Sequence, residues 1–257
     1  MYDFLVETAL LTHGLVSLSD QDILAVWPWE TAQLAWVEGG AVRRGTLEEF
    51  LPVRSRAKEM IRIDRDSLPV ALSGGVNGVL TASGAMAAAQ DMGVPVVVTA
   101  GMGGIGDIEG EELCPDLPAL AETDVVLVAT SPKDVLDIPV TIDWLLRNGI
   151  AVLGRETDVC CGFVFHRDDV PISGRWQPEQ RIAPHTLLLR EIPRDRRLRD
   201  DSILPAAKLA GQRARRGGNQ YHPAANAEID RLSNGISSRL QLQSLIDNGL
   251  WVEELLL

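Results

Sequence analysis

The stretch TDVVLVATSPKDVLDIPVTIDWLLRNGIAVLGR, residues 123–155, decides the expected fold. Two apolar runs, VVLVAT and IAVL, read as buried strands, and the segment between them has the apolar spacing of a helix. A strand, a helix and a second strand in this order form a crossover unit, which pairs its strands in parallel. The stretch therefore predicts an α/β protein.

The same alternation extends beyond this stretch. Residues 81–107 read as a helix, the strand VPVVVTA and a glycine-rich loop, whereas the last third of the chain carries mostly helical patterns. We therefore expect a central, largely parallel or mixed sheet flanked by helices, with a mainly helical C-terminal part. We also expect one compact α/β domain over residues 1–257.

The composition of the chain limits the kinds of partner that we expect it to bind. A formal charge of -12 without a long basic block argues against nucleic acid. The segment YDFLVETALL lacks the basic region of a signal peptide, and no apolar run reaches membrane-spanning length. Cys114, Cys160 and Cys161 are an odd number without the CxxC spacing of metal sites. We expect a cytoplasmic protein that binds a small molecule and contacts neither nucleic acid nor membrane.

Two charged residues follow predicted strands. Lys133 comes after VVLVAT and the turn Ser131-Pro132. Because ligands bind at the carboxyl ends of strands in open α/β sheets, Lys133 is either a solvated loop charge or a group aimed into a pocket. Glu7 follows an apolar strand, and it is either a surface carboxylate that caps a helix or a general acid whose pKa is raised by burial.

Two loops and a helix start carry further candidate groups. The glycine-rich loop of residues 96–107 can present N–H groups to an anion, although its spacing matches neither the dinucleotide nor the P-loop motif. Residues 109–116 form either a solvated acidic loop or a site for Mg²⁺ or Mn²⁺. Thr81 and Ser83 can cap a helix or bind phosphate. Arg62 reads as a surface ion-pair residue, and His222 as part of a turn that leads into a helix.

The order of these signals is more informative than any one of them. The segments VETALLTHGL, LTASGAM, TAGMGGIGD, residues 114–158 and NGISSRLQLQSLIDN together resemble the pseudouridine-5'-phosphate glycosidase family, also called indigoidine synthase A-like. The resemblance implies an α/β fold, a homotrimer and a divalent metal, usually Mn²⁺. It also implies an enzyme that reversibly cleaves the carbon–carbon glycosidic bond of pseudouridine 5'-phosphate, or of a related nucleoside phosphate, to give the base and ribose 5-phosphate.

The resemblance assigns roles to individual residues. Lys133 is implied to be the amine that forms an imine with the ring-opened ribose phosphate, and Glu7 the proton donor. A carbon–carbon bond to a base has no good leaving group, so the imine supplies an electron sink and an acid must protonate the base carbon. Glu112 falls on the metal ligand. The positions that contact the substrate are Arg62, Ala82, Cys114, Pro115, Asp116 and Gln241.

Several positions depart from the family pattern. Arg62 replaces a lysine, Glu112 an aspartate and Cys114 a serine. A His-Arg pair after Gly104 is lost. The family's TPF segment reads HPA from His222 onward.

In addition, Gln241 replaces the asparagine that recognises the base. Because these changes affect the groups that would hold phosphate and uracil, whereas Lys133 and Glu7 remain, two outcomes stay open. The chain is an enzyme of altered specificity, or a catalytically silent protein that binds a sugar phosphate. A metal-dependent hydrolase built on Glu109, Glu112 and Asp116 is a third alternative.

Overall fold

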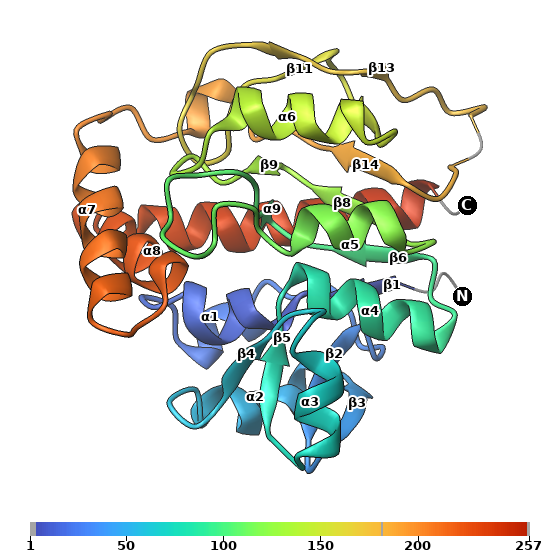
Figure 1. Ribbon diagram of the computed structural model, residues 1–257, viewed down its shortest axis with the longest axis vertical. Helices are drawn as coiled ribbons and strands as arrows, with labels where there is room; N and C mark the ends of the chain where they lie inside the picture. The colour runs from blue at the N-terminus through green and yellow to red at the C-terminus, as the bar shows by residue number, and fades with distance from the viewer. Residues whose placement is uncertain (1–3, 181, 256–257) are drawn as a thin grey trace.

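A computed structural model describes residues 4–180 and 182–255, and within them ten strands form one sheet (Figure 1). Nine of the strands follow one another across the sheet in the order β13 (Gly174–Arg175), β10 (Ala151–Gly154), β14 (Thr186–Leu189), β8 (Val126–Ala129), β6 (Val96–Val98), β1 (Phe4–Val6), β2 (Leu34–Glu38), β5 (Gly78–Leu80) and β4 (Ile61–Ile63). The tenth, β3 (Ala41–Gly45), pairs with β2.

The pairing is parallel from β13 as far as β2, and β4 is parallel to β5. Only the contacts of β2 with β3 and β5 are antiparallel among the described pairs of this sheet. The expected largely parallel or mixed sheet is therefore confirmed.

Alternate residues of the central strands enter two different cores. Phe4 and Val6 of β1 pack in one core, and Leu5 packs in the other. In a strand, successive side chains point to opposite faces, so the sheet separates two layers of helices. The first core includes side chains of α1 (Asp20–Leu24), α2 (Leu47–Ser55), α7 (Ile203–Arg216), α8 (Tyr221–Leu232) and α9 (Ile236–Leu255). The second includes side chains of α3 (Leu68–Ser73), α4 (Ala82–Met92), α5 (Asp116–Glu122) and α6 (Ile138–Arg147).

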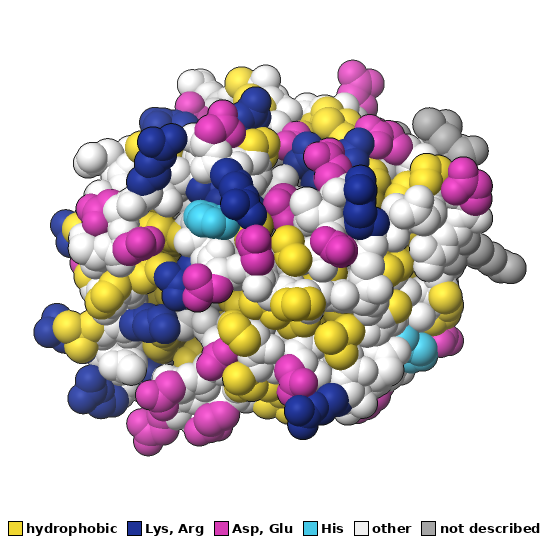
Figure 2. All heavy atoms as spheres, turned by 90° about the horizontal axis from the view of Figure 1, so that it is seen from above, with side chains coloured by type: hydrophobic (Ala, Val, Ile, Leu, Met, Phe, Trp, Pro, Cys, Tyr) yellow, Lys and Arg dark blue, Asp and Glu magenta, His cyan; other side chains and the backbone are white. Residues whose placement is uncertain are grey.

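The last three helices confirm the expected helical C-terminal part. Figure 1 shows α7 and α8 packed together at one end of the molecule, with α9 running back across it. Within the described part of the chain, no helix is both long and apolar enough to span a bilayer. On the face shown in Figure 2, Lys and Arg side chains are interspersed with Asp and Glu side chains.

The start of α4 is fixed closely against the edge of the sheet. The Thr81 side chain accepts a hydrogen bond from the backbone N–H of Gly84, which is the cap expected from the sequence. A Cβ atom on Gly84 would lie 2.2 Å from the carbonyl oxygen of Ile63, so only glycine allows α4 to approach β4 this closely. This contact places the beginning of α4 beside the strand that carries Arg62.

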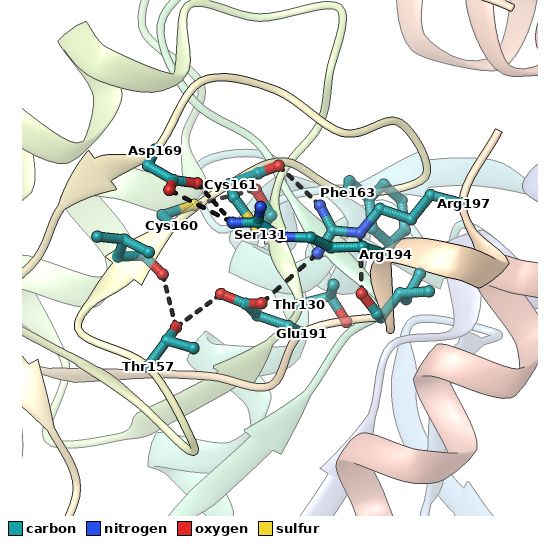
Figure 3. A network of polar contacts seen from close by, with 12 residues as sticks. Thr130, Ser131, Thr157, Cys160, Cys161, Phe163, Asp169, Glu191, Arg194 and Arg197 are labelled. Carbon is teal, nitrogen blue, oxygen red and sulfur yellow. Dashed lines mark hydrogen bonds and ion pairs between the residues drawn. The ribbon is translucent and has the colours of Figure 1, made fainter. Parts of the chain in front are cut away.

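A buried polar network surrounds Arg197 (Figure 3). The Arg197 guanidinium donates hydrogen bonds to the carbonyl oxygens of Ile192 and Cys161, at 2.8 and 2.7 Å, and lies 3.9 Å from the Glu191 carboxylate. Because a buried cation is costly unless its N–H groups find acceptors, these bonds tie the segment at Cys161 to Ile192.

Asp134 fixes the same segment from the other side. Its carboxylate accepts hydrogen bonds from the backbone N–H groups of Phe163, Val164 and Phe165, at 2.8, 2.9 and 3.1 Å. Burial raises the pKa of Asp134 to about 6, against the lowering effect of these three donors, so the group is mostly ionised at pH 7. The neighbour of Lys133 is thus an anchor of the backbone.

We predict that Asp134→Asn lowers the free energy of unfolding at pH 7 by about 1–3 kcal/mol. Both carboxylate oxygens accept N–H groups, so in either orientation the new NH₂ group faces a donor. Denaturant unfolding of Asp134→Asn and of the exposed control Asp143→Asn measures the difference, and the control should change by less than about 0.5 kcal/mol. Equal effects of the two substitutions would contradict the anchoring role.

Candidate active site

Several strands end at one edge of the sheet, and polar residues follow them there. Glu7 follows β1 and Thr99 follows β6, and the backbone N–H of Glu7 donates to the carbonyl oxygen of Val98 at 2.9 Å. Thr81 follows β5 and Thr130 follows β8. The carboxyl ends of parallel strands are the usual place for ligands in an open α/β sheet.

A cavity of about 440 Å³ opens at this edge. Its volume lies within the range of small-molecule sites. The cavity gathers seven of the residues singled out from the sequence, namely Glu7, Arg62, Ala82, Cys114, Pro115, Asp116 and Lys133. The sequence analysis therefore found one wall of a single cavity, although the roles of these residues stay predictions.

Lys133 is held by a short parallel pairing that the sequence did not reveal. Strands β7 (Gly101–Met102) and β9 (Ser131–Pro132) pair beyond the ends of β6 and β8, and the Lys133 N–H donates to the Met102 carbonyl oxygen at 3.1 Å. The lysine side chain is half-buried, and among the described residues it has neither a hydrogen bond nor an ion pair. Lys133 lines the cavity, which agrees with the second of the two alternatives, and its role stays a prediction.

Glu7 has the environment of a proton donor. Its side chain is 4% exposed, and the Thr99 hydroxyl donates to its Oε2. Burial raises the pKa of the Glu7 carboxyl, whereas the Lys133 charge and the Thr99 hydroxyl lower it. A buried carboxyl with a raised pKa retains its proton to higher pH and can act as a general acid.

Asp116 joins two parts of the cavity wall. Its Oδ1 accepts from the Ser83 N–H at 2.8 Å, and its Oδ2 accepts from the Gly103 N–H at 2.7 Å. A Cβ atom on Gly103 would lie 2.1 Å from the Cys114 sulfur, so the loop passes too close for any side chain at that position. The carboxylate therefore holds the glycine-rich loop against the first turn of α4.

Two arginines that are far apart in the sequence contribute positive charge to the cavity wall. Arg62 lies on β4 and, within the described residues, has neither a hydrogen bond nor an ion pair. Arg215 comes from α7 and donates from Nε to the Glu109 carbonyl oxygen at 2.8 Å. Sequence reasoning missed Arg215 because it lies among several arginines in a helix of mixed charge, where nothing distinguishes one from another.

His222 is marked in the sequence only as part of a turn and as a departure from the family's TPF segment, without a role of its own. It begins α8 beside Pro223, is 8% exposed, and lines the cavity together with Glu111. Its Nε2 lies 3.5 Å from Oε1 of Glu111. Burial lowers the pKa of His222, whereas contact with His222 lowers the pKa of Glu111, so a neutral imidazole lies beside a carboxylate.

Gln241 lies in a separate recess of about 10 Å³, which Glu7 and Lys133 also line. Its Oε1 accepts from Nδ2 of Asn226 at 3.1 Å, and its Nε2 donates to the Ser237 hydroxyl at 2.9 Å. The recess has room for about one water molecule. The structure thus brings Gln241 close to the cavity, but with its amide already engaged.

Glu112 lies outside the cavity that gathers the other predicted residues. Its side chain is exposed, and Oε1 accepts from the Gly110 N–H at 3.1 Å. Among the described residues, no group of three or more His, Cys, Asp or Glu side chains is arranged to hold a metal ion. A metal at Glu112 would thus not be held by three or more such side chains of the described residues, and we derive no chemical step through one.

Comparison with known proteins gives the relationship of the chain. A sequence model of the family described as "Indigoidine synthase A like protein" matches residues 31–245. A pseudouridine-5'-phosphate glycosidase of Methylobacterium nodulans is 34% identical over 186 residues, which are 69% of this chain and 55% of that protein. The chain thus spans about half the length of that relative. A protein of the same name from Petrotoga mobilis is 24% identical over 95% of this chain and 87% of its own length.

Two solved structures share the fold. An indigoidine synthase A-like protein from Thermotoga maritima superposes with a TM-score of 0.79, at 19% identity, over 98% of this chain and 91% of its own. The prealnumycin C-glycosynthase in complex with ribulose 5-phosphate gives a TM-score of 0.75, at 24% identity, over 99% and 90% of the two chains. At these identities the likeness concerns the fold alone.

We predict that Thr99→Val raises the pKa of Glu7 further above its ordinary value of 4.5. Loss of the hydroxyl donor removes a group that favours the carboxylate, so deprotonation requires a higher pH. A ¹³C NMR titration of the glutamate carboxyls measures the shift. Thr123→Val is the control, because the Thr123 hydroxyl donates to Ala119 and has no contact with Glu7. An unchanged Glu7 titration in Thr99→Val would show that the hydroxyl does not control this carboxyl.

Proposed function

The chain belongs to the indigoidine synthase A-like family, and from this premise we propose that it is a C-glycosidase. Its reaction cleaves, and in reverse forms, the carbon–carbon bond between a base and the sugar of pseudouridine 5'-phosphate or a related nucleoside phosphate. The products are the free base and ribose 5-phosphate. The names of the two relatives, and the sugar phosphate bound to the C-glycosynthase, support this substrate class.

One observation carries the proposal. The side chain of Lys133, which has no hydrogen-bond or ion-pair partner within the described residues, lines the same cavity as the buried carboxyl of Glu7. Imine chemistry needs an accessible amine, and protonation of the base carbon needs an acid that holds its proton. A solvated loop lysine and a surface glutamate would supply neither.

The proposed reaction uses these two residues in sequence. The Lys133 nitrogen bonds to the anomeric carbon, and the ring oxygen leaves that carbon with the electron pair and takes a proton. The nitrogen lone pair then forms a carbon–nitrogen double bond while the bond to the base breaks, and Glu7 gives its proton to the base carbon. Water hydrolyses the imine, which releases ribose 5-phosphate and regenerates the amine.

The positive charge in the cavity suits the phosphate end of the substrate. Arg62 and Arg215 both line it, and a guanidinium binds phosphate through paired N–H donors. The proposal also includes a divalent metal, Mn²⁺, with Glu112 as its ligand, a homotrimer, a cytoplasmic setting and a single domain over residues 1–257. These four points stay predictions from the sequence and its resemblance.

A second candidate function is a protein that binds sugar phosphates without cleaving them, or that acts on a different aglycone. The observation in its favour is the recess of about 10 Å³ at Gln241, where the amide is bonded to Asn226 and Ser237. A base cannot enter a space of this size without movement of those side chains. A reactive Lys133 separates the two candidates, because a silent binding protein has no use for an imine.

We predict that borohydride traps ribose 5-phosphate on Lys133 as a stable secondary amine. The sequence contains three lysines, Lys58, Lys133 and Lys208, so peptide mass spectrometry can assign the adduct unambiguously. Lys133→Ala should abolish the adduct, whereas the control Lys208→Ala, which changes an exposed lysine of α7, should keep it. An adduct spread equally over all three lysines, or none at all, would overturn the proposed chemistry.

A further inference from the structure

His222 is buried without adequate hydrogen-bond partners. Neither Nδ1 nor Nε2 has a hydrogen bond within the described residues, and Nε2 lies 3.5 Å from Oε1 of Glu111. That distance is long for a hydrogen bond. Leaving a buried polar atom unsatisfied costs about 1–3 kcal/mol, and each such group in a folded protein calls for an explanation.

The position of His222 explains why its ring nitrogens lack partners. His222 and Lys133 together line three adjoining spaces, which are the cavity of about 440 Å³ and two recesses of about 10 Å³ each. Glu111 also lines the large cavity, where it contacts the His222 imidazole. The carboxylate, the imidazole and the amine therefore come from three separate segments and meet at one place.

Burial keeps the imidazole neutral by lowering the pKa of His222, and the charges of Lys133 and Arg62 lower it further, against the contact with Glu111. Glu111, Lys133 and Arg62 are the charged groups that act on it most directly. Charged residues that also line the shared cavity are Glu7, Asp64, Asp66, Asp116 and Arg215. When Nε2 faces a carboxylate, that nitrogen carries the ring proton and Nδ1 is left as the acceptor.

We propose that His222, oriented by Glu111, is a proton carrier for the amine of Lys133. As the Lys133 nitrogen bonds to the anomeric carbon, it gives a proton to the imidazole. The bond between that carbon and the ring oxygen breaks, and the imidazole passes the proton to the oxygen. One bond forms, one breaks and one proton moves from nitrogen to oxygen, so the imidazole is neutral again at the end. Glu7 is thereby reserved for the base carbon.

This role rests on the proposed function and can fail independently of it. The test is the rate at which borohydride traps the adduct of ribose 5-phosphate on Lys133. We expect His222→Ala to slow trapping by about 100- to 10,000-fold, the usual contribution of a proton-transfer group. The concentration of ribose 5-phosphate that gives half the maximal rate should change by less than about threefold, because the side chain acts on proton transfer.

Chemical rescue separates a proton carrier from a structural residue. Added imidazole should restore part of the rate of His222→Ala, because it can occupy the space that the substitution opens. Glu111→Gln should slow trapping by about tenfold and should not respond to imidazole, because the ring is still present but poorly oriented. His222→Gln keeps most of the side-chain volume and should be as slow as His222→Ala, which guards against loss of folding. His166→Ala, at an exposed histidine, is the matched control and should react as the unaltered protein does.

Each outcome tests the role of His222, the imine chemistry of Lys133, or both. Trapping at an unaltered rate in His222→Ala and His222→Gln, with the adduct still on Lys133, would overturn the role of His222 and leave the imine chemistry intact. Slow trapping that imidazole does not restore in His222→Ala would reduce His222 to a structural residue. Absence of any Lys133 adduct in the unaltered protein would overturn both claims.

Discussion

The parallel register of β1, β6 and β8 fixes where the groups of the candidate site lie. Val6 lies opposite Val98, and Val98 lies opposite Val128, so the three strands end in step. Glu7 and Thr99 are therefore neighbours at one edge, and their side chains meet in a hydrogen bond. A shift of one residue in the pairing of β1 with β6 would turn alternate side chains to the other face and separate this pair. The apolar alternation of the strands, which fills two cores, holds the register and so holds the site.

The C-terminal helices supply cavity residues that the strands of the sheet do not. The strand ends supply Glu7 and the Lys133 segment, but Arg215 and His222 come from α7 and α8, which pack on one end of the sheet (Figure 1). Arg215 binds carbonyl oxygens of Glu109 and Gly110, and His222 contacts Glu111. The acidic loop thus serves as the contact between the helical part and the cavity. Its carbonyls and the Glu111 carboxylate contact Arg215 and His222, and the metal site predicted at Glu112 stays a prediction.

The sequence predicted the fold well because crossover units leave strong local signals. Lys133 and Glu7 could be singled out since each follows an apolar strand, and such positions converge in a parallel sheet. Arg215 and His222 could not, because a long-range contact places them and their own segments read as an ordinary charged helix and a turn. The position of Glu112 depends on a turn in which Gly110 has a φ of +70°, and this turn directs the carboxylate back to its own loop. Gln241 could be placed near the site, but its bond to Asn226 arises from packing between α8 and α9.

The large cavity and the recess at Gln241 differ in the size of group that they can hold. This difference bears on where the base of a substrate would bind, apart from where the bond would break. Glu7, Arg62, Lys133 and His222 line both the large cavity and the recess at Gln241, so the proposed reaction would take place at the boundary of the two spaces. Under the proposed function, Arg62 and Arg215 bind the phosphate in the large cavity. The base then has two places: the recess, which requires Asn226 to release Gln241, or the remaining volume of the large cavity. Because Gln241 is buried and bonded on both sides of its amide, releasing it costs hydrogen bonds that the base would have to replace. The large cavity is therefore the less costly place, and under the proposed function Glu111, His222 and the first turn of α4 select the aglycone there, instead of an amide at position 241.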